Sequence, residues 1–452
     1  MEFDGISRRI LMKRTGAGLV MLNFSGLLAA CGGDSSSGKS KPLSTKGSGL
    51  DVSTGSDIPK VTVKFGVAPF VDGAIYVIGM KQGWFDDVGI DIQPKPAGLQ
   101  TTPDNAIAKI VSGDADIGVI FGPGKVQNQA KTPNIKLFGM ANSFTGTQIL
   151  VSPAKAQQSV GELVASGTSF DEAVKQAFAP MKGQAIGLSS TGQRRTFLQN
   201  YFKLAGLSFS DVKPISTEDS RILQLARGGH IDYASPEGAA QQVALLDDGW
   251  KVLASIQDLI KGLPPGDPRA VSAIGHECVG ADQSYIEQNR ETCLRVLSVM
   301  FRIIDAIKTS PDQVTPDEAP YLSSVTGVTI TPAALAGQMK NLFDFRTFEE
   351  QTLYWDNLPG PFSYQTIYGA QIKAAAADGI LPKDSNVRPD DIIVGESFYR
   401  QMVQLKAAYD KLKPKASGLT GANGTLATQA ATQYTNRNYL DAYRMLNAAV
   451  NA

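Results

Sequence analysis

Apolar and polar positions along the first third of the chain follow two different periods. Runs that alternate, or that stay apolar over several residues, are typical of half-buried or buried strands. These runs cover 61–67, 90–93, 116–121 and 135–141. Residues 73–82 and 102–111 have a helical period instead, and Gly83 and Gly113 end these two helices. Strands that alternate with helices at this spacing predict βαβ units and a parallel sheet.

The same alternation starts again near residue 148. Further strands are predicted at 148–151, 185–188, 231–234 and 272–279. The two halves also share a local pattern, in which an apolar helix and a glycine precede an aspartate and a short strand. We expect these aspartates, Asp116 and Asp232, to make hydrogen bonds at the start of their strands. The repeat predicts two similar α/β lobes.

The pattern becomes mostly helical after the last of these strands. Ser284 and Glu287 have the spacing of a capping box, which predicts a long helix that runs to Lys308. Residues 311–413 are expected to be helical, with proline-rich breaks between the helices.

The last part of the chain, 414–452, is rich in Ala, Gly, Thr and Asn. Such a composition predicts a low-complexity or peripheral tail. Residues 438–450 have a pattern that a single helix would also satisfy.

The chain begins with a segment that resembles a twin-arginine export signal. The residues that carry this resemblance are Ser7, Arg8, Arg9 and Lys13. The apolar stretch that follows is too short and too polar to span a bilayer, which needs about 20 apolar residues. It ends in Leu28-Ala29-Ala30-Cys31, which resembles a bacterial lipobox whose cysteine is lipidated. We therefore expect a signal peptide over 1–30 that uses the twin-arginine translocase, and a lipid anchor on Cys31.

The residues after Cys31 are rich in glycine and serine, so 31–58 are expected to form a flexible tether to the membrane. The chain has 452 residues with 42% hydrophobic content, enough for two or three domains. Its formal charge is zero, and removal of residues 1–30 leaves about −2. The absence of a basic patch argues against a nucleic-acid partner.

Three cysteines are present, and one of them is Cys31. Cys278 and Cys293 remain, and an oxidising compartment would permit a disulfide between them. Cys293 also lies on the apolar side of a long helical pattern, as a buried free thiol would. The sequence is therefore compatible with a disulfide and with buried free thiols.

The sequence offers little support for an enzyme. It holds two histidines, His230 and His276, which are too few for most haem or multi-metal sites. His276, Glu277 and Cys278 are adjacent on a predicted strand, where alternating sides keep them from converging. No nucleophile elbow or dinucleotide-binding fingerprint occurs. We expect no catalytic residues, no metal and no cofactor.

Three segments carry a likeness to a known family. They are 64–68, 75–92 (with Gly83-Trp84-Phe85-Asp86-Asp87 at its centre) and 113–120. Together they resemble the solute-binding proteins of nitrate/sulfonate/taurine-type ABC importers, over roughly residues 60–310. The resemblance implies an α/β, type II periplasmic-binding fold: two α/β lobes with a ligand cleft, here with a helical C-terminal extension. The expected parts are lobe I over 59–147 and 271–310, lobe II over 148–270, a helical region over 311–413 and the tail over 414–452.

The resemblance also implies a function. Such a protein captures a small solute by hinge closure and delivers it to an ABC permease with its ATPase, from the periplasmic or extracytoplasmic face of the cell membrane. Phe70, Phe121, Phe144 and Tyr233 near the expected cleft favour an organic anion, a sulfonate or a carboxylate, over an inorganic ion. The alternatives are a ligand-sensing or interaction lipoprotein of the same fold and an exported enzyme.

Ligands of open α/β sheets bind beyond the carboxyl ends of the strands, so the loops there supply the candidate site. The candidates are Phe70, Asp72, Gly73, Gln100, Thr101, Thr102, Phe121, Gly122, Ser190, Thr191, Gly192 and Glu237. Ser190 and Thr191 open a helix, where they would either bind an anion or cap the helix. Glu237 would either accept a hydrogen bond from the ligand or lie in the first turn of a helix.

Overall fold

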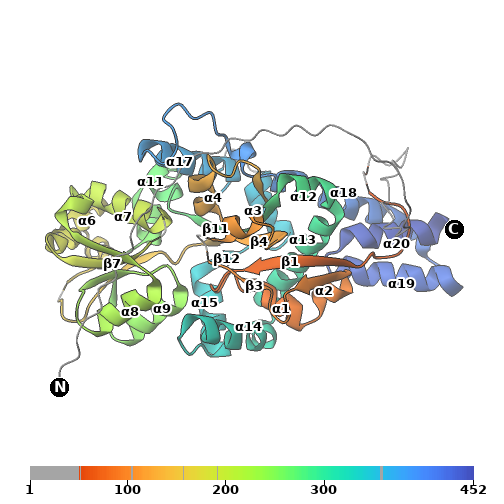
Figure 1. Cartoon of the computed structure of the whole chain (residues 1–452), viewed down its shortest axis with the longest axis horizontal. Helices are drawn as coiled ribbons and strands as arrows, with labels where there is room; N and C mark the ends of the chain where they lie inside the picture. Colours follow the sequence, from red (N-terminus) through yellow and green to blue (C-terminus); the bar gives the residue numbers. More distant parts are fainter. Residues whose placement is uncertain are drawn as a thin grey trace, which may run out of the picture. The chain divides into compact units, whose positions relative to one another are not determined.

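The structure is a computed structural model that describes residues 50, 52–102, 105–155, 157–190, 192–356 and 360–451. The export-signal residues Ser7, Arg8, Arg9 and Lys13, the lipobox residue Cys31 and Thr191 lie outside these ranges. Two mixed sheets, each covered by helices, make up two lobes (Figure 1).

Lobe I is built on a sheet of seven strands. They are β1 (Val61–Val67), β2 (Ile90–Gln93), β3 (Leu99–Gln100), β4 (Ile117–Phe121), β5 (Ile135–Phe144), β11 (Gly275–Asp282) and β12 (Phe343–Phe345). The order is β12-β5-β11-β4-β1-β2, and β3 pairs with β1. β1 is parallel to β2 and β4, whereas β11 runs antiparallel to β4 and β5. The predicted parallel units are therefore present, but two antiparallel strands complete the sheet.

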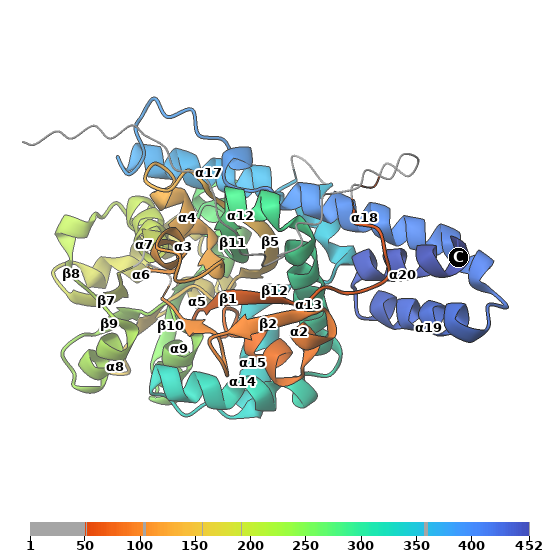
Figure 2. The ribbon, with the colours of Figure 1, turned by 45° about the vertical axis from the view of Figure 1, so that its right-hand side comes forward.

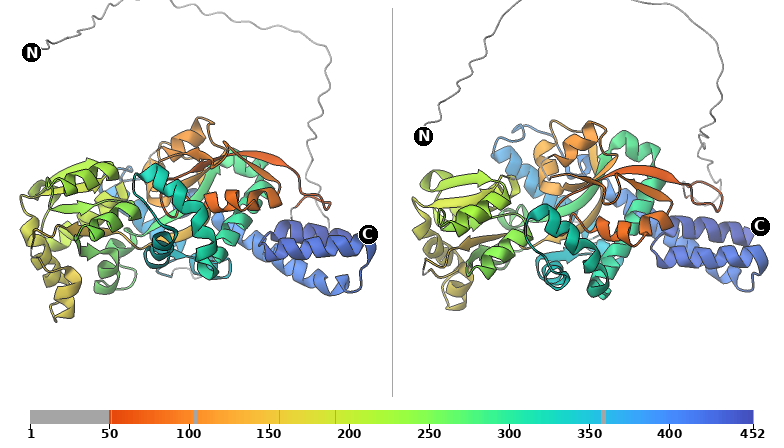
Figure 3. Two further views of the ribbon diagram at one scale, coloured as in Figure 1. Left: turned by 90° about the horizontal axis from the view of Figure 1, so that it is seen from below. Right: turned by 60° about the horizontal axis from the view of Figure 1, so that its bottom comes forward.

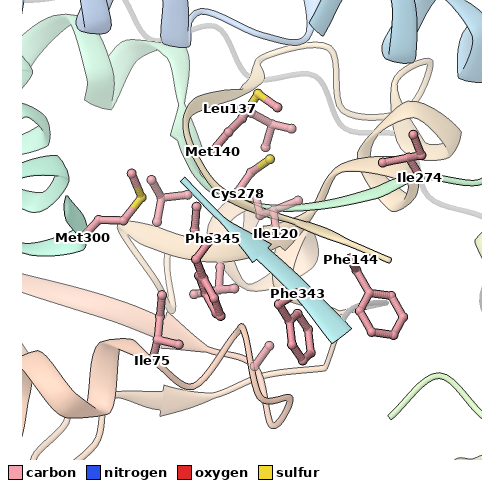
Figure 4. Packing of buried hydrophobic residues seen from close by; sticks show 14 of the residues in the cluster. Ile75, Ile120, Leu137, Met140, Phe144, Ile274, Cys278, Met300, Phe343 and Phe345 are labelled. Carbon is pink, nitrogen blue, oxygen red and sulfur yellow. The ribbon is translucent and has the colours of Figure 1, made fainter. Parts of the chain in front are cut away.

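Helices cover both faces of this sheet. They include α1 (Tyr76–Lys81), α2 (Trp84–Asp87), α3 (Ala106–Val111), α4 (Gly122–Asn128), α12 (Gln283–Gln288) and α13 (Arg290–Thr309). β1 buries Val63, Phe65 and Val67 completely, because alternate residues of a strand point to the same face of the sheet, whereas Thr62 and Lys64 on the other face are exposed. Figure 4 shows the resulting core, in which Ile75 just before α1, Ile120 on β4 and Met300 on α13 all take part.

Lobe II is built on five strands in the order β10-β6-β9-β7-β8. They are β6 (Gln148–Val151), β7 (Ala185–Ser189), β8 (Lys213–Thr217), β9 (Tyr233–Ser235) and β10 (Lys251–Ser255). Its helices are α5 (Val160–Ala165), α6 (Phe170–Phe178), α7 (Gly192–Ala205), α8 (Asp219–Arg227), α9 (Ala239–Asp247), α10 (Ile256–Gly262) and α11 (Pro268–Val271). A second apolar cluster around Ile222, Leu245 and Trp250 lies within this lobe.

The chain crosses between the lobes twice. Both crossings lie where β5 ends and its neighbour β11 begins. β5 ends at Phe144 and β6 of lobe II begins four residues later, at Gln148. The return crossing follows α11 and enters β11 at Gly275, which pairs with Phe144. The two crossings therefore lie side by side, as a hinge between two lobes requires.

The long predicted helix is in fact two helices. Asp282, not Ser284, caps α12, because its carboxylate accepts a hydrogen bond from the Ser284 N–H at 2.8 Å. The capping box of Ser284 and Glu287 was therefore wrong, and α13 begins anew at Arg290. Cys278 on β11 and Cys293 on α13 are both buried free thiols.

The rest of the chain is helical. It contains α14 (Pro311–Thr326), α15 (Pro332–Leu342), α16 (Thr352–Trp355), α17 (Tyr364–Ala377), α18 (Gly395–Leu412), α19 (Gly421–Thr435) and α20 (Tyr439–Asn451). The segment 414–452, which we expected to be a low-complexity or peripheral tail with a possible helix over 438–450, contains α19 and α20. Figures 2 and 3 show both packed beside α18, on the side of lobe I that faces away from lobe II. Tyr439, Leu440 and Leu446 of α20 are buried, which offsets the entropy of ordering this polar segment.

A buried ion pair ties α20 to α13. The Arg295 guanidinium donates two hydrogen bonds to the Asp441 carboxylate, at 2.8 and 2.9 Å, and Arg444 adds a third at 2.7 Å. Burial disfavours the charge on Asp441, but the hydrogen bond from Arg295 keeps its pKa below the usual value. The C-terminal helices are thus part of lobe I.

We predict that Asp441→Ala will lower the free energy of unfolding by about 3–5 kcal/mol, because it removes the carboxylate that accepts two hydrogen bonds from the buried Arg295 and leaves Arg295 with the more distant Glu291, at 3.7 Å. Urea denaturation followed by circular dichroism measures this loss. The matched control is Asp410→Ala, which removes an exposed partner of Lys406 on α18 and should cost less than about 1 kcal/mol. If both variants lost the same free energy of unfolding, the buried ion pair between Arg295 and Asp441 would not have the stabilising role assigned to it.

Candidate functional site

A cavity of about 30 Å³, here called the central cavity, lies where the two lobes meet. Its lining residues are Phe70, Val71, Asp72, Phe121, Phe144, Glu237, Ala239, Glu277 and Phe343. Glu237, between β9 and α9, and Ala239, the first residue of α9, come from lobe II, and all the others come from lobe I. The cavity therefore changes whenever the lobes move relative to each other.

A larger space of about 150 Å³, the outer cavity, shares Phe70 and Glu237 with the central one. Its lining residues are Pro69, Phe70, Thr102, Ser189, Ser190, Glu218, Asp219, Ser220, Glu237, Gln241, Val325 and Thr326. It too draws on both lobes, since Thr102 follows β3 whereas Ser189 ends β7. The two cavities together form the cleft.

Three carboxylates line the central cavity and reach it from three separate elements. Asp72 lies in the loop after β1, Glu277 on β11 and Glu237 after β9. Their exposed fractions are 5%, 3% and 8%, respectively. Burial raises the pKa of Asp72 to about 6. Burial, and then the charges of Asp72 and Glu237, raise the pKa of Glu277 well above its usual value.

The alternation along β11 separates Glu277 from its neighbours. His276 stacks on Tyr368 of α17 with ring centroids 5.7 Å apart, and Cys278 Sγ lies 3.4 Å from the Tyr368 hydroxyl. Burial lowers the pKa of His276 to about 3. Glu277 lines the cavity on the other side. The prediction that these three residues do not converge is confirmed.

Phenylalanine rings form the apolar walls of the central cavity. Phe144 and Phe343 lie beside each other with ring centroids 5.0 Å apart (Figure 4), and Phe70 and Phe121 line it from the ends of β1 and β4. A site of this kind combines apolar contact with few polar groups that fix orientation.

On the lobe II side, the segment before α9 is held by Asp219. Its carboxylate accepts hydrogen bonds from the N–H groups of Glu237, at 3.1 Å, and Gly238, at 2.6 Å. Arg194 on α7 lies fully buried near Glu237 and Asp219. Burial lowers its pKa, while the two carboxylates oppose that change. Within the described residues, no hydrogen-bond partner is found for its guanidinium nitrogens.

Half of the candidates from the sequence line the cleft. These are Phe70, Asp72, Thr102, Phe121, Ser190 and Glu237. Gly192 begins α7, and Thr191 lies outside the described residues.

The other four candidates have structural contacts instead. Thr101 is buried, and its hydroxyl donates to the Val67 carbonyl at 3.2 Å. Gln100 is exposed on β3. A Cβ on Gly73 would lie 2.8 Å from Ala68 Cβ, and one on Gly122 would lie 2.2 Å from the Tyr368 hydroxyl, so close packing requires glycine at both positions.

The sequence analysis did not place Glu277 or Phe343 in the site. Glu277 interrupts an otherwise apolar strand pattern, which was the available signal for a functional charge. Phe343 belongs to a three-residue strand inside a region expected to be helical, and no local pattern marked it.

Comparison with protein families matches residues 56–314 to the NMT1-like family. The chain belongs to the NMT1-like family. No curated protein sequence matches it. The match ends within α14, so α15–α20 follow the part that this NMT1-like chain shares with its family.

Solved structures share the fold. The periplasmic nitrate-binding protein NrtA from Synechocystis PCC 6803 is 15% identical, with a TM-score of 0.54 over 77% of this chain and 89% of that chain. The alkanesulfonate-binding protein SsuA from Xanthomonas axonopodis pv. citri, bound to MOPS, is 14% identical, with a TM-score of 0.52 over 75% of this chain and 99% of that chain. The periplasmic aliphatic sulphonate binding protein SsuA from Escherichia coli is 14% identical, with a TM-score of 0.50 over 73% of this chain and 91% of that chain. The α/β, type II periplasmic-binding fold with additional C-terminal helices, predicted for this NMT1-like chain, is confirmed.

We predict that Asp72→Asn will flatten the pH dependence of stability between about pH 4 and 6. The folded protein keeps the Asp72 proton up to about pH 6, whereas the unfolded chain loses it near 3.8, so the native protein loses stability as the pH rises through this window. The total effect is about 3 kcal/mol. Urea unfolding at pH 4, 5, 6 and 7 measures it.

The control for this experiment is Asp171→Asn, at an exposed position on α6. In this variant, the free energy of unfolding should change with pH as it does in the wild-type protein. If Asp72→Asn showed the same pH dependence as well, the desolvated carboxyl at the cavity would not have the predicted effect.

Proposed function

We propose that this chain is the extracytoplasmic solute-binding component of an ABC importer. One observation carries the proposal: residues of both lobes line the central cavity, with Asp72 and Glu277 from lobe I and Glu237 from lobe II. A solute bound there contacts both lobes and favours the closed arrangement over the open one. The partner is an ABC permease with its ATPase, which recognises the closed form.

The comparisons support this proposal. The matched structures are named as nitrate-binding and sulfonate-binding periplasmic proteins, and they share the two-lobed fold. The tether and lipobox support the same role, since a binding protein that delivers to a membrane permease gains from being held near it. A sensor of the same fold is distinguished by the lack of a permease partner.

We further propose export through the twin-arginine translocase and a lipid anchor on Cys31. The support is the order and spacing of Arg8, Arg9 and Cys31 in the sequence. Throughout the part of the chain that the structure describes, no helix has the length and apolar character needed to cross a membrane. The acyl chains on Cys31 would supply the attachment.

For the solute, the sequence resemblance points to an organic sulfonate or carboxylate. Arg194 supports this class, because it is a buried cation close to the cleft. It does not line either cavity, however, and the charges that do are all negative.

We predict that one class of small solute will raise the melting temperature of the full-length protein in detergent. The panel contains nitrate, bicarbonate, sulfonates, carboxylates, pyrimidines and amines. A ligand at 100 times its Kd stabilises the native state by about 2.7 kcal/mol. A panel in which no compound changes the melting temperature would count against solute capture.

We also predict that Cys31→Ala will move the protein from the membrane fraction to the soluble fraction, because it removes the proposed attachment point of the acyl chains. Cell fractionation with immunoblotting measures the distribution. Cys293→Ala serves as the control and should leave the protein in the membrane fraction. Membrane association that survives Cys31→Ala would exclude the proposed anchor.

A further inference from the structure

We propose that the cleft binds a small organic cation, with a positively charged nitrogen carried on an apolar body. This inference rests on the proposed solute-binding function and names its ligand class. It differs from the sulfonate or carboxylate that the sequence resemblance implies.

The charges that line the cleft are of one sign. The central cavity presents Asp72, Glu237 and Glu277, and the outer cavity adds Glu218 and Asp219. Among the described residues that line the two cavities, none is Lys, Arg or His. Like charges that lie close together in a space shielded from water repel one another, and an incoming cation would offset that repulsion. A sulfonate or carboxylate would instead add a like charge.

Glu277 supplies an independent observation. Its side chain is 3% exposed and lines the central cavity, and its Oε1 atom has no hydrogen-bond partner within the described residues. Buried acceptors in native proteins are normally satisfied. An ammonium group in the cavity would donate the missing hydrogen bond.

The aromatic walls fit the same ligand. Phe70, Phe121, Phe144 and Phe343 line the central cavity, and a phenyl ring has no hydrogen-bond donor to offer to sulfonate oxygens. The face of an aromatic ring does attract a cation, because the ring's quadrupole places negative charge there. Phenyl rings next to carboxylates thus favour a cationic head with apolar substituents.

Arg194 acts as a counter-charge within lobe II. Arg194 lies near Glu237 and Asp219. Its single positive charge cannot balance these two carboxylates and also those of Asp72 and Glu277. A divalent metal is a poorer occupant, because within the described residues no three His, Cys, Asp or Glu side chains are placed to hold one. The remaining class is an organic cation.

The pH dependence of binding follows from the same geometry. A cation binds best when Asp72 and Glu277 are ionised, so its affinity should rise with pH, and the affinity of an anion should fall. The groups that face these two carboxyls are Tyr76 on α1, Glu237 before α9, Cys278 on β11, Glu318 on α14 and Tyr368 on α17. None of them carries a positive charge.

The test uses four probes that share one benzyl skeleton: benzylammonium, benzyltrimethylammonium, phenylmethanesulfonate and neutral phenylmethanol. Isothermal titration with the full-length protein in detergent gives each Kd at pH 6, 7 and 8. We expect the two cations to bind at least ten times more tightly than the sulfonate and the alcohol. We also expect their Kd values to fall as the pH rises.

Two variants locate the effect. Glu277→Gln should weaken binding of the cations at least tenfold while it keeps the shape of the side chain. Glu287→Gln, at an exposed position on α12, should leave binding unchanged. Circular dichroism and the melting temperature establish that both variants are folded.

Each outcome separates the two proposals. Tight binding of the sulfonate or the alcohol, with weak binding of the cations, would overturn the cation inference and leave solute capture intact. Cation binding that Glu277→Gln does not weaken would overturn the assignment of the site. A titration in which none of the four probes binds would contradict the cation inference, and the wider melting-temperature panel would then decide on solute capture itself.

Discussion

The antiparallel pairing of β5 with β11 is the constraint on which the cleft depends. Gly275 pairs with Phe144 at the end where both crossings leave lobe I, and Glu277 pairs with Asn142 farther along the same strands. The pairing therefore sets the position of the hinge, one phenyl wall and one carboxylate together. Gly275 has to be glycine, since a Cβ there would lie 2.4 Å from the Phe121 ring and 2.7 Å from Gln193.

The cleft couples charge to lobe closure. Asp72 and Glu277 belong to lobe I, whereas Glu237 is carried by lobe II, where Asp219 holds its backbone. Bringing the lobes together concentrates like charges in a space with phenyl walls and little water, which is unfavourable until a proton or a ligand compensates. The same side chains that we propose as the solute-binding site would therefore oppose closure of the lobes around an empty site. A binding protein gains from this arrangement, because its closed form then reports that the solute is present.

Much of the fold could be predicted from the sequence, because the hydrophobic pattern within short stretches indicates most of the strands and helices. The strands expected at 61–67 and 90–93 are β1 and β2, and Asp116 and Asp232 accept the expected hydrogen bonds, from the Lys64 N–H and the Ser152 hydroxyl. The candidate site was predicted only in part, because its geometry depends on distant pairings. β12 brings Phe343 to the cleft by pairing with β5, and α20 is ordered by an ion pair across almost 150 residues. No local window of the sequence contains either contact.

The place where the chain enters lobe I has a mechanical consequence. Ser53 donates hydrogen bonds to Glu291 at the start of α13, and Arg444 of α20 donates to the Ser53 carbonyl at 3.1 Å. A force applied at this entry point is therefore shared between α13 and α20 before it reaches β1. The C-terminal helices lie on the side of lobe I opposite to lobe II (Figures 1 and 3). Lobe I and the C-terminal helices are thus joined where the chain enters the fold, and lobe II is connected to them through the two crossings.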